Sequence, residues 1–341
     1  MKCIDSKKFF QNRMAKRSKT TALILAFSLS ITAGCGQEVN IENPYDVYES
    51  PRAYGLNTTV SSTSKAASFF AENLCVADSE DKLSSDVTAS LSEAAGLFNI
   101  QENTMEFGKN IHQRVYPAST TKILTAYTAL KHGDLAATAT VTEAELQLEQ
   151  GSTVCGLSVG DTINLEELLY GLMLCSGNDA ANVIADMISG SPEAFAQLMN
   201  QEALALGATN SHFVNPHGLH SEDHYTTVYD MYLIFQAALQ EKQFVTIISS
   251  PSHTGMVTSA LGETSGKEWS NSNKYLNGEK AVPEGVQVVG GKTGTTNAAG
   301  YCLVLYSQKG GSVPYISIVY KSDTRDNLYL EMTELLEKIS K

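Results

Sequence analysis

The sequence has few cysteines for its length, and they follow no recognisable pattern. Of the six, Cys3 and Cys35 lie near the N-terminus, and the other four are scattered over residues 75–302 without a CxxC pair. This spacing excludes a zinc ribbon and does not indicate a disulfide scaffold. We expect these four cysteines, Cys75, Cys155, Cys175 and Cys302, to be small buried hydrophobic residues.

Basic residues are also scarce. There are 24 Lys and Arg against 37 Asp and Glu, giving a net charge of −13, and seven of the basic residues fall within the first 20 positions. A nucleic-acid partner is therefore not expected, because phosphate contacts require Lys and Arg. The hydrophobic content of 43% over 341 residues is enough for a packed globular core.

The N-terminus has the order of an export signal. The basic segment is followed by an apolar run, Thr21–Ile31, which is shorter than the roughly 20 residues of a membrane span, and then by Thr32-Ala33-Gly34-Cys35. The small residues before Cys35 resemble a bacterial lipobox, with Thr32 in place of the usual Leu. We expect residues 1–35 to be a lipoprotein-type signal peptide and Cys35 to carry lipid; ordinary cleavage or an uncleaved anchor are the alternatives.

Lipid on Cys35 would hold the protein at the outer face of the cytoplasmic membrane or in the cell wall. Residues 36–85 are polar and rich in Ser, Thr and Pro, so they are predicted to form a spacer, with a short helix near Ala66–Leu74. The globular domain is predicted to cover residues 86–341.

Within this domain the apolar period changes along the chain. Apolar residues at steps of three and four predict helices over residues 121–132, 164–174, 180–188, 192–206 and 326–339. Short β-rich runs predict a hairpin around residues 94–107 and strands at 286–289, 300–306 and 315–320, the last two joined by a turn at 309–312. Strands at both ends with helices between them predict an α/β (α+β) fold, in which both ends build one sheet and a helical subdomain is inserted.

Three short motifs occur in order. In Ser119-Thr120-Thr121-Lys122, helical spacing brings the lysine amine beside the serine hydroxyl. A serine needs an adjacent base to become nucleophilic, and a lysine can act as that base when burial or neighbouring cations lower its pKa. Taken alone, the pattern equally fits a solvated helix start with Ser119 as N-cap.

The second motif is Ser176-Gly177-Asn178, directly after an apolar helix; its hydroxyl could relay a proton, although a plain turn is the simpler interpretation. The third is Lys292-Thr293-Gly294-Thr295 at the end of a strand. Its lysine and threonines could bind a carboxylate, and its glycine would leave room for another backbone. A strand-end turn with a solvated lysine is the alternative.

SxxK, SxN and KTG, separated by 57 and 116 residues, form a specific combination. With Phe213–Leu219 and Thr296–Leu303, they make the chain resemble the serine-type D-alanyl-D-alanine carboxypeptidases, which are low-molecular-mass penicillin-binding proteins of peptidase family S11. The resemblance implies the serine β-lactamase/DD-peptidase fold, with a mostly antiparallel five-stranded sheet. It also implies removal of the terminal D-Ala from peptidoglycan stem peptides, inhibition by β-lactams, and no metal or cofactor.

The resemblance also assigns roles to individual residues. Ser119 would be the acylated nucleophile, Lys122 its base, and Ser176 the donor of a proton to the leaving amine. Asn178 would bind the peptide carbonyl. Lys292, Thr293 and Thr295 would hold the terminal carboxylate, and the backbone N–H groups of Ser119 and Thr295 would form the oxyanion hole.

Other functions remain open. The same residues would serve a weak β-lactamase or a DD-endopeptidase, although the ExxLN segment of class A β-lactamases is absent between Asn178 and Lys292. A protein that acylates slowly, as a penicillin sensor or wall-binding protein, is a further alternative. Many relatives carry a second, β-rich domain after the catalytic one, and we expect none here.

Two further features of the sequence could suggest metal or thiol chemistry. Four histidines lie close together in sequence, but they lack HExxH spacing, so polar loop histidines are a better interpretation than a zinc site. These are His212, His217, His220 and His224. Cys175 beside Ser176 could suggest a thiol nucleophile, yet a cysteine that packs a helix is the simpler interpretation.

Overall fold

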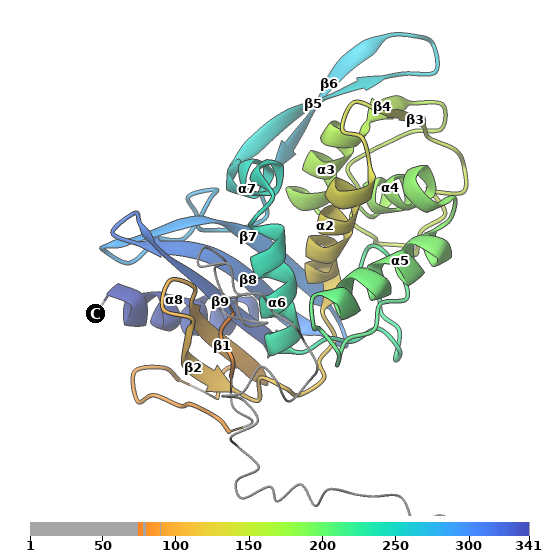
Figure 1. The fold of residues 1–341 in the computed structure, drawn as a ribbon. Coiled ribbons are helices and arrows are strands. Elements are labelled where there is room, and N and C mark those ends of the chain that lie inside the picture. The colour runs from red at the N-terminus through yellow and green to blue at the C-terminus, as the bar shows by residue number, and fades with distance from the viewer. Residues whose placement is uncertain (1–73, 78–79, 89, 341) are drawn as a thin grey trace, which may run out of the picture. The chain divides into compact units, whose positions relative to one another are not determined.

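A five-stranded antiparallel sheet assembled from both ends of the domain forms the base of the fold. The computed structural model describes residues 74–77, 80–88 and 90–340. The strand order is β2-β1-β9-β8-β7, so the first strand lies directly beside the last (Figure 1). The strands of this sheet are β1 (Ala94–Asn99), β2 (Thr104–Lys109), β7 (Val286–Thr296), β8 (Gly300–Lys309) and β9 (Val313–Ser322).

This arrangement confirms the predicted sheet and its two hairpins. β1 and β2 pair across the turn after Asn99, and β8 and β9 pair from Lys309 opposite Val313. Side chains alternate between the two faces of β9, as the period of two requires. Ile316, Ile318 and Tyr320 belong to one core, and Tyr315 and Val319 to the other.

Helices cover both faces of the sheet. On one face α8 (Arg325–Ser340) packs its apolar side, including Leu328 and Leu335, against β8 and β9. On the other face α6 (Val228–Ala238) lies against β1 and β9, where Phe98 stacks on Tyr232 with ring centroids 4.3 Å apart. The sheet therefore sits between two apolar layers.

The helical part of the chain forms a second lobe (Figure 1). The helices predicted from the apolar period are present with small shifts at their ends. They are α2 (Lys122–His132), which follows the 3₁₀ turn η3 (Ala118–Thr121), then α3 (Leu165–Met173), α4 (Asn178–Ser189) and α5 (Pro192–Ala205). Asn164 and Ser191 cap α3 and α5 by accepting from backbone N–H groups three residues on.

The inserted lobe is largely helical, as predicted, but it also contains strands that were not predicted. It carries a four-stranded antiparallel sheet, in the order β3-β4-β5-β6, and the long hairpin β5–β6 extends from it (Figure 1). Its strands are β3 (Thr138–Thr140), β4 (Thr162–Asn164), β5 (Ser252–Thr258) and β6 (Thr264–Ser270). Most of these residues are polar, and half of them are exposed, so their sequences show no clear apolar alternation.

Two helices were also missed. α6 is almost wholly buried, and α7 (Lys242–Ser249) is only eight residues long. A helix that is apolar on all sides shows no clear period of 3.6, which explains why the sequence analysis did not detect α6.

Residues 74–77, which the sequence analysis assigned to the spacer, pack against α6. Cys75 is fully buried, its N–H donates to Tyr232 Oη at 2.8 Å, and its carbonyl accepts from Tyr229 Oη at 2.9 Å. The predicted signal segment, Cys35, and almost all of the predicted helix near Ala66–Leu74 lie outside the described residues. Among the described residues, no helix is both long and apolar enough to span a bilayer.

Candidate active site

The three motifs meet where the sheet faces the helical lobe. Ser119 lies in η3 and Lys122 begins α2. Ser176 lies in the turn between α3 and α4, and Lys292 lies within β7. Ser119 is half-buried, whereas both lysines are at most 1% exposed. Burying two lysines in one site is costly unless their environment compensates them.

Lys122 is held by three oxygen atoms from three segments. Its Nζ lies 3.0 Å from Ser119 Oγ, 2.7 Å from Asn178 Oδ1 and 2.7 Å from the His217 carbonyl oxygen. Burial, and then the positive charge of Lys292, hold the pKa of Lys122 well below its usual value. The neutral amine is thus favoured. Its two hydrogens match the amide and carbonyl oxygens, and its lone pair faces the Ser119 hydroxyl.

Lys292 is paired with the second motif. Its Nζ donates to Ser176 Oγ at 3.0 Å and to the Thr293 carbonyl oxygen at 2.9 Å. Burial lowers the pKa of Lys292 to about 7, so this lysine exchanges a proton near neutral pH. Ser176 itself has φ +65°, a left-handed conformation that is costly for a residue other than glycine.

The turn that contains Ser176 is fixed by the residue that follows the motif. Asp179 is 1% exposed, and its carboxylate accepts from the backbone N–H groups of Cys155, Gly156 and Leu157 at 2.8–3.1 Å. Asn178 N–H donates to the Thr153 carbonyl oxygen at 2.8 Å. These hydrogen bonds hold the loop at 153–157 against the start of α4. The role of Asp179 was not predicted, because an acidic residue near a helix start suggests only a favourable interaction with the helix dipole.

Gly294 lets β7 approach the turn at residues 117–121. This turn contains the candidate nucleophile Ser119 and is called the nucleophile turn. A Cβ there would lie 3.0 Å from the Pro117 carbonyl oxygen and 3.0 Å from Ser119 N. The sequence analysis expected this glycine to leave room for another backbone. In the structure, the protein's own turn at 117–120 lies in that space. β7 is the last strand in its sheet, so Thr293 and Thr295 lie on a strand with only one partner.

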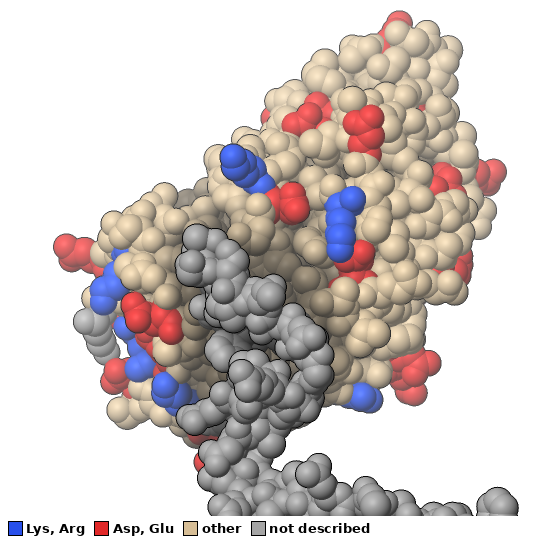
Figure 2. Space-filling model, in the orientation of Figure 1, with Lys and Arg blue, Asp and Glu red and all other residues tan. Residues whose placement is uncertain are grey.

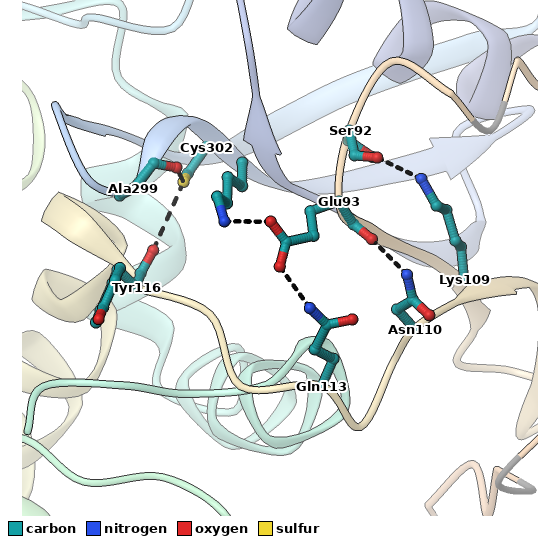
Figure 3. Close-up of polar contacts among 9 residues, drawn as sticks. Ser92, Glu93, Lys109, Asn110, Gln113, Tyr116, Ala299 and Cys302 are labelled. Carbon is teal, nitrogen blue, oxygen red and sulfur yellow. Dashed lines mark hydrogen bonds and ion pairs between the residues drawn. The ribbon is translucent and has the colours of Figure 1, made fainter. Parts of the chain in front are cut away.

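The segment before Ser119 is tied to the sheet (Figure 3). The Glu93 carboxylate pairs with Lys321 and accepts from the Gln113 side-chain amide. Nearer the turn, the Cys302 thiol lies 3.9 Å from the Tyr116 carbonyl oxygen. These contacts join the approach to η3 with β8 and β9, and so they fix Ser119 relative to the edge strand.

The segment Phe213–Leu219 forms the other wall of the nucleophile turn. Its His217 carbonyl accepts from Lys122, and its Pro216 carbonyl accepts from Thr125 Oγ1 at 2.6 Å. Gly218 has φ +88°, and a Cβ there would lie 1.9 Å from the carbonyl oxygen of Ala118. Only glycine fits this contact.

The four histidines do not gather as a metal site. His224 Nδ1 accepts from the Val214 N–H at 3.2 Å, so its Nε2 carries the proton and donates to Thr121 Oγ1 at 2.8 Å. Burial, with further contributions from nearby cationic groups, lowers the pKa values of His217 and His224 to about 3. Within the described ranges, no group of three His, Cys, Asp or Glu residues could hold a metal ion. His224 instead supports the nucleophile turn as a neutral side chain, and His217 does so through its backbone carbonyl.

Two hollows flank the site and share Thr295. The smaller, about 110 Å³, is lined by Thr293, Thr295 and Arg325 among others. The larger, about 380 Å³, lies between the loop at 149–152 and residues 295–298. Arg325 was missed by the sequence analysis, because nothing in its local sequence indicates that the start of α8 reaches the site. On the face shown in Figure 2, acidic and basic side chains are scattered rather than gathered into a patch.

The comparisons with known proteins agree on one family. A family model described as D-alanyl-D-alanine carboxypeptidase matches residues 84–324. D-alanyl-D-alanine carboxypeptidase DacF of Bacillus subtilis is 34% identical over 236 residues, which is 68% of this chain and 57% of the relative. DacB2 of Mycobacterium tuberculosis is 35% identical over 206 residues, 60% of this chain and 66% of the relative. The chain therefore spans less than two thirds of the length of these relatives.

Solved structures show the same fold. The Streptomyces K15 DD-transpeptidase superposes with a TM-score of 0.68 at 28% identity, covering 73% of this chain and 97% of that protein. A penicillin-binding protein homologue from Mycobacterium tuberculosis gives a TM-score of 0.65, also at 28% identity, over 74% of this chain and 92% of that protein. The predicted DD-peptidase fold is thereby confirmed.

Gly218→Ala tests the contact between Gly218 and Ala118. The matched control is Gly190→Ala, since Gly190 also has a positive φ, +78°, but has no atom within 4 Å of an added Cβ. The control should lose about 1–2 kcal/mol from the left-handed backbone alone. Gly218→Ala should lose at least about 2 kcal/mol more, because the Ala118 backbone must move. Urea unfolding of both variants measures this; equal losses would show that the turn yields freely.

Lys292→Met tests the burial of the Lys292 charge. Because the folded-state pKa of Lys292 lies below its usual value of 10.5, the unfolded chain binds more protons between pH 7 and 10.5, and stability from this group rises with pH. Methionine removes this dependence, so the variant's stability relative to wild type should fall by up to about 1.4 kcal/mol per pH unit from pH 7 to 9.

Cys75 and Cys302, whose pKa values burial raises to about 11 and 12, add an opposite slope to the stability of both proteins above pH 9, and this slope cancels in the difference between them. Urea unfolding at each pH measures the difference, and the exposed Lys280→Met serves as control. A difference between Lys292→Met and wild type that does not change with pH would contradict the buried, titrating lysine.

Proposed function

The chain belongs to the D-alanyl-D-alanine carboxypeptidase family, and we propose that it removes the terminal D-Ala from peptidoglycan stem peptides through an acyl-enzyme on Ser119. One observation carries this proposal above the others: the buried Lys122 amine lies 3.0 Å from Ser119 Oγ in surroundings that favour its neutral form. A neutral amine at hydrogen-bond distance is the general base that a serine nucleophile requires.

Acylation begins with proton transfer from Ser119 to Lys122. The Asn178 and His217 oxygens already take the two hydrogens of the neutral amine, so its lone pair is directed at the hydroxyl. The ammonium that forms is then held by three oxygen atoms. Ser119 Oγ attacks the carbonyl carbon between the two D-Ala residues, and the backbone N–H groups of Ser119 and Thr295 stabilise the resulting oxyanion.

The leaving amine needs a proton, and Ser176 is placed to supply one. Its hydroxyl lies 3.0 Å from Lys292 Nζ, whose pKa near 7 lets it replace the proton that Ser176 gives up. Water then hydrolyses the acyl-enzyme by the reverse of these transfers. The roles of Ser176 and Lys292 thus depend on their contact.

The terminal carboxylate of the substrate is bound on the side of the smaller hollow. Lys292, Thr293 and Thr295 supply a cation and two hydroxyls, and Arg325 adds a second cation at the same hollow. The acyl portion extends into the larger hollow along residues 295–298, where β7 has no strand on its outer side. β-Lactams present a carboxylate beside a reactive carbonyl, so they acylate Ser119 through the same contacts.

Ser119→Ala tests the nucleophile. The purified full-length protein, incubated with a fluorescent penicillin, should be labelled only when Ser119 is present. D-Ala release from a D-Ala-D-Ala pentapeptide should fall by a factor of about 10³ or more in the variant, because the remaining groups cannot form an acyl-enzyme. Ser265→Ala, an exposed change in β6, is the matched control.

The outcomes separate the alternatives. Labelling at Ser119 without D-Ala release would favour a penicillin-binding protein of slow turnover, and release of hydrolysed penicillin at a rate comparable to D-Ala release would favour a weak β-lactamase. Absence of labelling in the wild-type protein would rule out Ser119 as nucleophile.

We also propose that the protein is exported and lipid-anchored at Cys35, at the outer face of the cytoplasmic membrane. The basic segment, the apolar run and the small residues before Cys35 support this localisation. A Cys35→Ala variant should lose incorporation of labelled fatty acid and appear in the soluble fraction of bacterial cells. Equal incorporation in variant and wild type would overturn the anchor, and Cys3→Ala is the control.

A further inference from the structure

Two of the four described cysteines meet beneath the Ser176 turn. Cys155 lies in the loop at 153–157 and Cys175 directly precedes Ser176. They are 20 residues apart in sequence, yet the fold brings them to the same glycine of α3. Both sulfur atoms lie against Gly171: Cys175 Sγ is 3.1 Å from its carbonyl oxygen, and a Cβ added to Gly171 would lie 3.1 Å from Cys155 Sγ. The other two described cysteines, Cys75 and Cys302, lie elsewhere, against Tyr232 and Tyr116.

The two thiols differ in chemistry. The hydrogen bond donated by Cys155 lowers the pKa of Cys175, with a further contribution from the positive charge of Lys292. The same hydrogen bond, together with burial, raises the pKa of Cys155. Cys155 is 6% exposed, whereas Cys175 is half-buried. Cys175 is therefore the thiol that ionises and meets a reagent first, and Cys155 lies behind it.

We propose that Cys155 and Cys175 form a disulfide that clamps the loop at 153–157 to the Ser176-Gly177-Asn178 turn when the protein meets a small-molecule disulfide. The Cys175 thiolate attacks a sulfur of oxidised glutathione, which releases one glutathione thiolate and leaves a mixed disulfide. Cys155 Sγ then attacks the Cys175 sulfur and releases the second glutathione. The two protons lost by the protein thiols end on the two glutathione thiols, so the protein is oxidised and one glutathione disulfide is reduced.

Hydrogen bonds hold the backbone on both sides of the proposed bond. Cys155 N–H donates to Asp179 at 2.8 Å, its carbonyl accepts from Trp269 Nε1 at 2.9 Å, and Asn178 N–H donates to Thr153 at 2.8 Å. With these bonds kept, Ser176 stays beside Lys292. We therefore expect the oxidised protein to retain penicillin labelling within about twofold while gaining resistance to heat, since the bond closes a 20-residue loop.

The first test maps the bond in the full-length protein. The chain is treated with oxidised glutathione, remaining thiols are alkylated under denaturing conditions, and the non-reduced protein is digested. Trypsin does not separate the pair, because no Lys or Arg lies between His132 and Glu241, but cleavage after Glu149, Glu166, Glu167 and Glu193 does. We expect peptides 150–166 and 168–193 to be linked, with Cys75 and Cys302 alkylated.

Single substitutions test the order of attack. Cys155→Ala should trap glutathione on Cys175, because the resolving thiol is gone. Cys175→Ala should leave Cys155 free of glutathione, because the buried thiol does not react first. Glutathione on Cys155 in the second variant, or two separately alkylated peptides from the oxidised wild type, would overturn the proposal.

The second test measures the effect of the disulfide on the melting temperature of the wild-type protein, with Cys155→Ala as the control. Oxidised wild type should melt about 5–10 °C above the protein reduced with a phosphine, a difference that Cys155→Ala should abolish. A linked protein that melts no higher, or that loses penicillin labelling, would show that the bond distorts the turn rather than clamping it, and would overturn the proposal.

Discussion

The structure depends on one buried amine. Lys122 has no carboxylate in contact with its Nζ among the described residues, and its three oxygen partners come from η3, α4 and the segment at 213–219. Each of these segments has to be placed within hydrogen-bond distance of one atom, or a polar group is left buried without a partner. The same crowding that makes burial expensive keeps the amine neutral and therefore basic. Burial of this amine lowers the stability of the fold but makes the amine a better base. Its oxygen partners reduce the cost of burial, and Gly218 and Gly294 let the surrounding segments come close enough.

The candidate catalytic residues could be predicted because the spacing within each motif is short and the residue types are restricted. Ser119 and Lys122 are one turn apart, and the structure brings them together as expected. The supporting residues could not be predicted in this way. Asp179 binds a loop some 20 residues earlier, and Gly218 faces the Ala118 carbonyl from a segment 100 residues later. Such contacts depend on tertiary structure and leave no local pattern to detect.

The same reasoning explains which elements of the fold were predicted. The amphipathic helices repeat their apolar residues at steps of three and four, and the main-sheet strands β8 and β9 are short, largely buried β-rich runs bounded by turns, so their sequences indicate them. α6 is buried on nearly all sides and lacks a period, and the strands of the β5–β6 hairpin are mostly polar, with only Met256, Val257 and Trp269 as large apolar residues. Cys75 is a further case, because its backbone bonds to two tyrosines of α6. The three apolar residues around it were too few to distinguish a packed segment from a spacer.

The pairing of β1 with β9 places the first strand of the domain beside one that ends at Ser322. The central sheet therefore cannot close until β9 has been synthesised, and the pairing spans more than 200 residues. Pairings of such high contact order form late and slowly. Because β7, which contacts η3 directly, follows it by more than 150 residues, a nascent chain carries Ser119 and Lys122 before the strand that completes the candidate site. Because of this topology, the candidate site cannot assemble until the strands from both ends of the domain are present.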